Sequence, residues 1–255
     1  MKPRVMSLVI FTSVVGLLIA PNQIDFLTAT LSLIAIALGA GAAGALNMWY
    51  ESDLDALMTR TCLRPIPTGK VSRNQALFFG VATSCGSVIA LYFFSNFLSA
   101  LMLSITILFY VVVYTIWLKQ RTPQNIVIGG AAGAFPPIIG WTVATGTITF
   151  EPIILFLIIF FWTPSHFWAL SLYKTEDYTN AKIPMLPVVS GIKTTKINIF
   201  IYAIILFFIS IVPYFFGYFG NTYFISSLYN SRNKSTFPLF KRKPRANNIR
   251  AELWL

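Results

Sequence analysis

The sequence contains repeated apolar runs of about 20 residues, and this feature limits the possible fold more than any other. A helix of that length crosses a hydrocarbon layer of about 30 Å. Of the 255 residues, 56% are hydrophobic and only 11% are charged, whereas about a quarter of a soluble domain is charged. The sequence therefore predicts an all-α, polytopic transmembrane helix bundle of about seven spans. The expected spans are residues 5–21, 26–48, 75–94, 97–118, 125–146, 152–173 and 197–220.

The formal net charge of +11 indicates membrane topology rather than nucleic-acid binding. The Lys and Arg residues lie between the apolar runs instead of forming one basic face. Through residue 196, every basic loop falls on one side of the membrane if the N-terminus is cytoplasmic. The opposite connections, at 22–25, 95–96 and 147–151, contain no Lys or Arg. The expected orientation therefore places the N-terminus and the acidic motifs on the cytoplasmic side.

This seven-span topology fails at the C-terminus, where a strongly basic segment would follow the seventh span on the external side. Residues 222–229 are too few to cross a bilayer as a helix. We therefore divide the chain into a transmembrane bundle, residues 1–220, and an atypical basic tail, residues 221–255. Either a distorted eighth crossing of the membrane exists, or this C-terminal sequence does not belong with the preceding bundle.

The first cluster of acidic residues follows the second span. Asn47, Glu51 and Asp55 are spaced i, i+4 and i+8, which places them on one face of a helix. Two carboxylates one turn apart repel each other, so we expect a cation between them. Carboxylate and amide oxygens suit Mg²⁺ better than zinc. Asp53 points elsewhere, and the alternative for the whole cluster is a solvated loop.

Basic side chains follow this acidic face directly, at Arg60, Arg64 and Lys70. Mg²⁺ is usually held by a few carboxylates together with substrate phosphates, and Arg or Lys neutralises the remaining phosphate charge. The segment therefore predicts a membrane enzyme that handles a phosphorylated substrate bound through Mg²⁺. The alternative is that the arginines only anchor the loop to lipid headgroups.

Two further features lie in or after the sixth expected span. Glu176 and Asp177 follow this span as the first cluster follows the second, so two acidic helix ends could hold metal across one cavity. By itself such a pair is also an ordinary solvated helix end. His166, the only histidine, lies inside the span among aromatic residues. It could ligate or position a heme, act as a base, or be a satisfied interior residue.

Three long segments resemble the UbiA-type intramembrane prenyltransferases, and in particular their heme-farnesylating branch. The segments are NMWYESDLDALMTRTCLRPIPTG, WLKQRTPQNIVIGGAAGAFPPIIGW and TPSHFWALSLYKTEDYTNAKIPMLPVVSG. Their order and separation also agree, and the likeness covers about residues 2–200. The resemblance implies a nine-helix bundle in which two acidic motifs bind farnesyl diphosphate through Mg²⁺. It also implies that the farnesyl group joins a vinyl group of heme b to give heme O for terminal oxidases.

Roles for individual residues follow from their positions in these segments. The implied residues are Asn47, Glu51, Asp55 and Asp177 for catalysis and Mg²⁺ binding, Arg60, Arg64 and Lys119 for the diphosphate, and His166 for heme. The implied partners are farnesyl diphosphate, heme b, the lipid bilayer and a downstream heme A synthase or oxidase, with no nucleic acid. The implied location is the inner membrane of a bacterium.

The sequence departs from the family's pattern at three places. Glu51 stands where the family usually has Asp, and Ser165 stands where a second Pro commonly precedes His166. After about residue 220, the last two expected helices are absent, which is consistent with truncation or a shifted reading frame. The competing hypotheses are polyprenyl transfer to an aromatic quinone precursor, a membrane transporter without enzymatic activity, and an inactive remnant.

Overall fold

The computed structural model describes residues 3–59, 61–221, 223, 225 and 227. The chain divides into two compact units, residues 1–209 and 210–255. In the described residues every regular element is a helix, so the all-α prediction is confirmed. The helices are α1 (Pro3–Ile19), α2 (Phe26–Tyr50), α3 (Ser52–Leu57), α4 (Arg73–Phe94), α5 (Phe97–Leu108), η1 (Phe109–Leu118), α6 (Asn125–Ala134), α7 (Pro136–Thr145), α8 (Phe150–Tyr173), α9 (Thr175–Asn180), α10 (Leu186–Val189) and α11 (Gly191–Phe215).

Within this part of the chain, six helical stretches are long and apolar enough to cross a membrane. They are α2, α4, α5 with η1, α6 with α7, α8, and α11. Helix α1 is the remaining expected span, and it is apolar but only 17 residues long. The chain is therefore an integral membrane protein, with helices close to all seven expected spans.

Three spans differ in detail from the sequence prediction, and the one expected at 97–118 passes from α5 into the π-helix η1. The last begins at Gly191 rather than residue 197, because Gly191 adopts a positive φ of 76° and starts a new helix directly after α10. The span expected at 125–146 is divided at Phe135 into α6 and α7. Pro136 and Pro137 follow the break, and proline lacks the N–H that would continue the hydrogen-bond ladder of α6.

Small residues allow the first unit's helices to approach closely. The glycine- and alanine-rich stretch of α2 is buried, and α2 packs mainly against α4. Helix α1 packs mainly against α7, where a Cβ added at Gly16 would overlap the Pro137 carbonyl and one added at Gly140 would overlap the Ser13 carbonyl. This agrees with the expectation that helices use small side chains at interfaces within a membrane.

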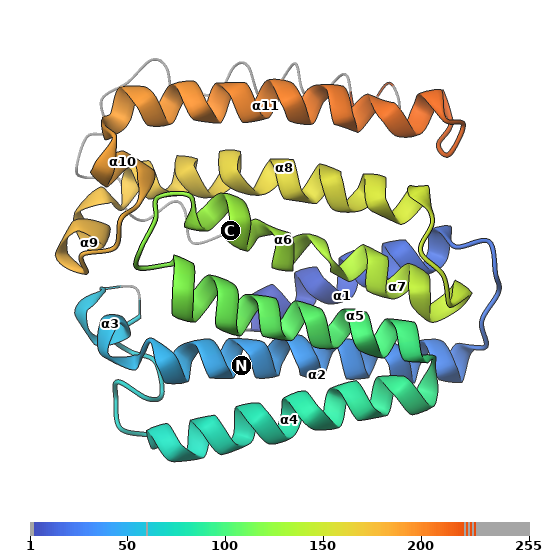
Figure 1. Cartoon of the computed structure of the whole chain (residues 1–255), viewed down its shortest axis with the longest axis horizontal. Helices are drawn as coiled ribbons and strands as arrows, with labels where there is room; N and C mark the ends of the chain where they lie inside the picture. Colours follow the sequence, from blue (N-terminus) through green and yellow to red (C-terminus); the bar gives the residue numbers. More distant parts are fainter. Residues whose placement is uncertain (1–2, 60, 222, 224, 226, 228–255) are drawn as a thin grey trace. The chain divides into compact units, whose positions relative to one another are not determined.

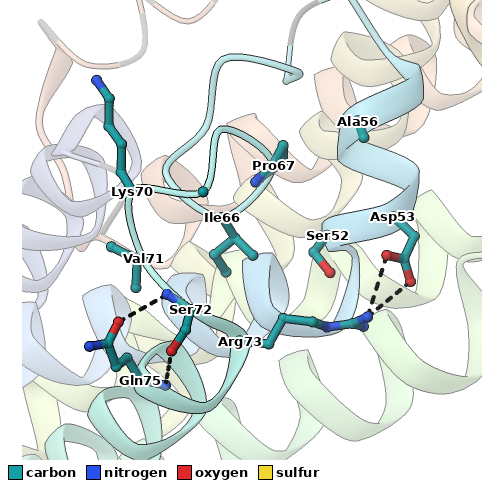
Figure 2. A pocket seen from close by; sticks show the side chains of 11 residues that line it. Ser52, Asp53, Ala56, Ile66, Pro67, Lys70, Val71, Ser72, Arg73 and Gln75 are labelled. Atoms are coloured by element: carbon teal, nitrogen blue, oxygen red, sulfur yellow. Dashed lines mark hydrogen bonds and ion pairs between the residues drawn. The ribbon is translucent and has the colours of Figure 1, made fainter.

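The short helices α3, α9 and α10 gather at one end of the first unit (Figure 1). Here the chain leaves α3 and returns into α4 through a capping box. The Ser72 hydroxyl accepts from Gln75 N–H at 3.2 Å, and Gln75 Oε1 accepts from Ser72 N–H at 2.9 Å (Figure 2). This reciprocal cap satisfies backbone donors at the first turn of α4 and fixes where the loop ends.

The second unit contains the end of α11 and the residues that follow it. The Tyr223 hydroxyl donates to the Ser210 carbonyl at 2.9 Å, and Phe219 stacks on Tyr223 with ring centroids 4.7 Å apart. Of the expected basic tail, only residues 221, 223, 225 and 227 are among those described. The division at residue 220 therefore stays a prediction.

Candidate functional site

The first acidic motif lies where α2 passes into α3. Asn47 belongs to the last turn of α2, Glu51 occupies the junction, and Asp55 lies on α3. The helical hydrogen bonds continue across this junction, because Glu51 N–H donates to the Asn47 carbonyl at 3.0 Å and Asp55 N–H to the Glu51 carbonyl at 2.8 Å. The three residues are only 1%, 2% and 3% exposed. The spacing that predicted a common face thus brings all three into the interior.

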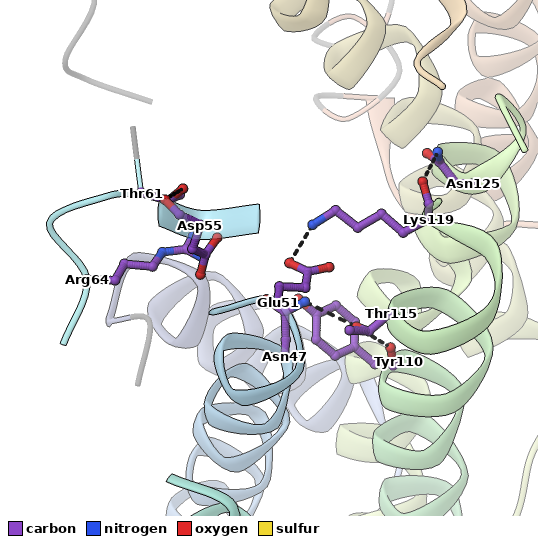
Figure 3. Close-up of polar contacts among 9 residues, drawn as sticks. All are labelled: Asn47, Glu51, Asp55, Thr61, Arg64, Tyr110, Thr115, Lys119 and Asn125. Carbon is purple, nitrogen blue, oxygen red and sulfur yellow. Dashed lines mark hydrogen bonds and ion pairs between the residues drawn. The ribbon is translucent and has the colours of Figure 1, made fainter. Parts of the chain in front are cut away.

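Each buried carboxylate of this motif has its own cationic partner (Figure 3). Lys119 Nζ lies 2.5 Å from Glu51 Oε2, and Arg64 Nη1 lies 2.6 Å from Asp55 Oδ2. These side-chain cations neutralise part of the charge of the two carboxylates, and the metal ion expected between the carboxylates stays a prediction. Both cations are among the residues predicted to bind diphosphate. Such pairing matters because a buried carboxylate without a counter-charge is strongly destabilising.

The donor set of the motif fits a hard divalent cation. Glu51 Oε1 is buried and has no hydrogen-bond partner in the described part of the protein, so this oxygen could ligate a cation. Amide and carboxylate oxygens are the ligands that Mg²⁺ prefers. Among the described residues, however, no three His, Cys, Asp or Glu side chains lie close enough to hold a metal by themselves. The geometry therefore suits a cation that brings substrate phosphate oxygens as further ligands.

The π-helix η1 carries a contact that sequence reasoning missed. Thr115 is fully buried and accepts a hydrogen bond from Asn47 Nδ2 at 3.2 Å. Its own hydroxyl donates to the Tyr110 carbonyl, five residues back, at 2.9 Å. Thr115 contacts Asn47, and Lys119 contacts Glu51. The two residues on each helix are four positions apart. This matched spacing on two apolar helices is the signal that could have revealed the pair.

Asn125 supports the segment that carries Lys119. It is fully buried at the start of α6, and its Nδ2 donates to the Lys119 carbonyl at 3.2 Å (Figure 3). Its Oδ1 has no hydrogen-bond partner within the described residues. Asn125 therefore fixes the backbone from which the Lys119 ammonium reaches Glu51. Sequence reasoning gave it no role.

The second acidic motif is joined to the segment that leaves α3. The Thr59 hydroxyl lies 2.9 and 3.1 Å from the two carboxylate oxygens of Asp177, a residue of α9. Residues 118 positions apart in the sequence therefore meet at the same end of the first unit. In the region that the structure describes, no hydrogen bond or ion pair joins Asp177 directly to Asn47, Glu51 or Asp55.

The other predicted residues have different outcomes. Arg60 lies outside the described residues, so its role stays a prediction. His166 is half-buried on α8 and stacks on Trp162, with ring centroids 4.3 Å apart and planes inclined by 15°. Its role towards heme also stays a prediction. Ser165, which the resemblance places where a proline is common, donates its hydroxyl to the Ile199 carbonyl of α11 at 3.3 Å.

Lys70 lies at a different site from Arg64, with which the sequence grouped it and which pairs with Asp55. It lines a pocket beside α3 and the start of α4, together with Asp53 and Arg73 (Figure 2). Asp53 and Arg73 form an exposed ion pair there, at 3.2 Å. The expectation that Asp53 points away from Glu51 and Asp55 agrees with this position.

A membrane bundle with two acidic motifs at one end agrees with the comparison with known families. Residues 9–230 match the UbiA prenyltransferase family, and the chain belongs to this family. Among its curated relatives, the protoheme IX farnesyltransferase of Pelagibacter ubique (strain HTCC1062) is 64% identical over 228 residues, which cover 89% of this chain and 75% of that protein. The protoheme IX farnesyltransferase of Afipia carboxidovorans is 56% identical, with 89% and 73% covered.

Solved structures show the same fold at low sequence identity. A digeranylgeranylglyceryl phosphate synthase aligns with a TM-score of 0.74 at 20% identity, covering 88% of this chain and 78% of that one. A UbiA homolog from Archaeoglobus fulgidus, bound to DMAPP and Mg²⁺, aligns with a TM-score of 0.71 at 15% identity, covering 90% and 83%. The membrane-helix fold predicted from the sequence is confirmed by these likenesses.

Proposed function

We propose that this protein transfers the farnesyl group of farnesyl diphosphate to a vinyl group of heme b, with water adding to the vinyl carbon left cationic by the new C–C bond, giving heme O, diphosphate and a proton. The proposal rests on two buried carboxylates, each of which forms an ion pair with a Lys or Arg side chain. The chain that contains them is 64% identical to a protoheme IX farnesyltransferase. The relatives favour heme over a quinone precursor as the acceptor.

The first chemical requirement is departure of the diphosphate. As the allylic C1–O bond breaks, its electron pair stays on the diphosphate, and the developing negative charge must be stabilised. Mg²⁺ held by Asn47, Glu51, Asp55 and Asp177 would supply Lewis-acid stabilisation of that charge. The ammonium of Lys119 and the guanidinium of Arg64 lie beside the same carboxylates and would stabilise it electrostatically. Arg60, which follows the motif in sequence, would add a further cation.

The second requirement is an acceptor held against the allylic carbon. His166 and its stacked partner Trp162 present a flat aromatic surface on α8, which matches the planar heme. We assign His166 the role of orienting heme. Aromatic rings also attract cationic carbon centres through their faces, so this surface would shelter the allylic cation from water.

The cellular setting follows from the same proposal. The protein would lie in a bacterial inner membrane with its N-terminus and both acidic motifs on the cytoplasmic side, as the basic loops indicate. Its product would pass to a downstream heme A synthase or to a terminal oxidase. Farnesyl diphosphate, which carries a charged head and an apolar chain, would bind with its head at the acidic end of the bundle.

Expression in a host that lacks its own heme O synthase tests the proposal directly. We expect heme O in the membranes by mass spectrometry, and none from an Asp55→Ala variant that is expressed to the same level. A prenylated aromatic ring without heme O would show that the acceptor is wrong. If a well-inserted chain makes neither product, the proposal of an active enzyme fails, leaving the inactive remnant and the transporter.

A further inference from the structure

A pocket of about 600 Å³ opens on the outer side of α3, between the loop after that helix and the start of α4 (Figure 2). None of the residues that line it is among those to which the family resemblance assigns catalysis, diphosphate binding or heme binding, although Lys70 follows the acidic face in the sequence. Asp53 faces it with a side chain that is 82% exposed, whereas Glu51 and Asp55 are buried against their own cations. The pocket is therefore separate from the acidic motif, although it shares α3 with it.

The charges of the pocket suit an anion. Arg73 contacts both Asp53 oxygens through Nη1 alone, at 3.2 and 3.3 Å. Within the described residues, its Nε and Nη2 remain available to a second acceptor. Lys70 makes no ion pair with any residue that the structure describes, and it extends from the rim. Two cations and one carboxylate give the lining a net charge of plus one.

A buried hydroxyl provides a second, independent indication of a ligand. Ser52 lines the pocket and is only 5% exposed. Its Oγ is buried and has no hydrogen-bond partner in the described part of the chain. A buried hydroxyl without a partner is costly, and a phosphate oxygen in the pocket would satisfy it.

The pocket continues into a surface suited to an acyl chain. Ile66 and Val71 contribute apolar side chains to its wall, and Gln75 lines it from the first turns of α4. Phe78 and Phe79 follow Gln75 by three and four residues, so they lie on the same face of α4. They are 78% and 46% exposed, as expected of side chains that face lipid.

We propose that this pocket binds the phosphate headgroup of an anionic phospholipid, whose acyl chains lie along Phe78 and Phe79. A net positive lining, an unpartnered buried hydroxyl and an adjoining apolar face together match an amphiphile better than a free phosphate ion. Basic pockets at the membrane surface commonly recognise anionic headgroups in this way. The site is independent of farnesyl transfer, so it can be tested whether or not the proposed reaction is confirmed.

Native mass spectrometry of the detergent-purified protein tests the assignment by titration with phosphatidylglycerol or phosphatidylcholine. We expect phosphatidylglycerol to bind more tightly, and a Lys70→Gln/Arg73→Gln variant to bind it about tenfold more weakly. The matched control is Arg121→Gln/Lys193→Gln, which removes two exposed cations outside the pocket. The control should bind phosphatidylglycerol as the unmodified protein does.

Two results would overturn the proposal. An equal loss in both double variants would show that overall charge attracts the lipid and that the pocket does not. Full competition by glycerol 3-phosphate, at concentrations comparable to the lipid, would show a site for soluble phosphates. If the double variant fails to fold, Lys70→Gln alone decides the question, because Lys70 pairs with no described residue and its loss leaves the Asp53–Arg73 pair intact.

Discussion

At the scale of single residues, the Lys119–Glu51 ion pair is the most sensitive contact of the site. Its carboxylate is 2% exposed and its ammonium side chain 18%. Removing one partner of such a pair leaves a charge buried without compensation, which costs about 3 kcal/mol. Replacing both partners by neutral groups of similar size costs much less.

We therefore expect Lys119→Met to lower the unfolding free energy by about 3 kcal/mol, and Glu51→Gln/Lys119→Met to recover most of that loss. Both variants should lose heme O formation, because each removes a group assigned to diphosphate departure. Thermal unfolding in detergent provides the stability comparison. Equal stability of the single and double variants would contradict a buried, coupled pair.

Thr115 provides a subtler test, because its hydroxyl touches Asn47 and no proposed substrate group. Thr115→Val removes the hydrogen bond to Asn47 Nδ2 while preserving shape, so we expect a loss of about 1 kcal/mol in stability and a lower kcat. Thr115→Ser should retain both. Thr142→Val is the matched control: Thr142 is equally buried, and among the described residues its hydroxyl bonds only to the Ile139 carbonyl. A kcat that falls equally in the control would refute a specific role for Thr115.

At the scale of helices, the contact between α1 and α7 depends on two glycines. Gly140→Ala would drive a methyl group into the Ser13 carbonyl, so we expect destabilisation by about 1–3 kcal/mol. Gly133→Ala is the control, because a Cβ there meets nothing within 4 Å and alanine favours helix by about 1 kcal/mol. Thermal midpoints of the two variants should move in opposite directions. A neutral Gly140→Ala would mean that the helices separate without cost.

The helices also show which parts of the structure the sequence could predict. Apolar runs located the spans, because length and hydropathy are local properties. The break before Pro136 was readable from the two prolines, although we did not predict it. The π-helix was not, because residues 109–118 are as apolar as a membrane-spanning α-helix. Only backbone hydrogen bonds that span five residues, such as the one from Lys119 N–H to the Tyr114 carbonyl, distinguish it. The hydrogen bond between Thr59 and Asp177 could not be predicted either, because no local sequence pattern relates positions that are 118 residues apart.

At the scale of the whole molecule, the two acidic motifs should respond together to substrate. With Mg²⁺ present, a farnesyl diphosphate analogue that cannot react, such as the thiolodiphosphate, should stabilise the folded chain by about 2.7 kcal/mol at one hundred times its Kd. We expect Asp177→Asn to reduce this shift without altering the ligand-free midpoint, since within the described residues the Asp177 carboxylate is hydrogen-bonded only to an exposed threonine hydroxyl. Asp53→Asn is the control, because Asp53 lies in the separate pocket beside α3 and is not proposed to bind the diphosphate. An equal shift without Mg²⁺ would argue against a metal-bound diphosphate.

The separation of Glu51 from its partner has a consequence for biogenesis. The partner of Asp55, Arg64, follows it by only nine residues, whereas the partner of Glu51, Lys119, follows it by 68 residues. The ribosome must therefore synthesise α4, α5 and η1 before Lys119 is available to Glu51. During translation, α2 therefore enters the membrane carrying an uncompensated carboxylate at its end. That carboxylate must stay near the aqueous boundary until Lys119 arrives, since burying it alone is costly. The Glu51–Lys119 ion pair can therefore form only after the helices up to η1 have been inserted into the membrane.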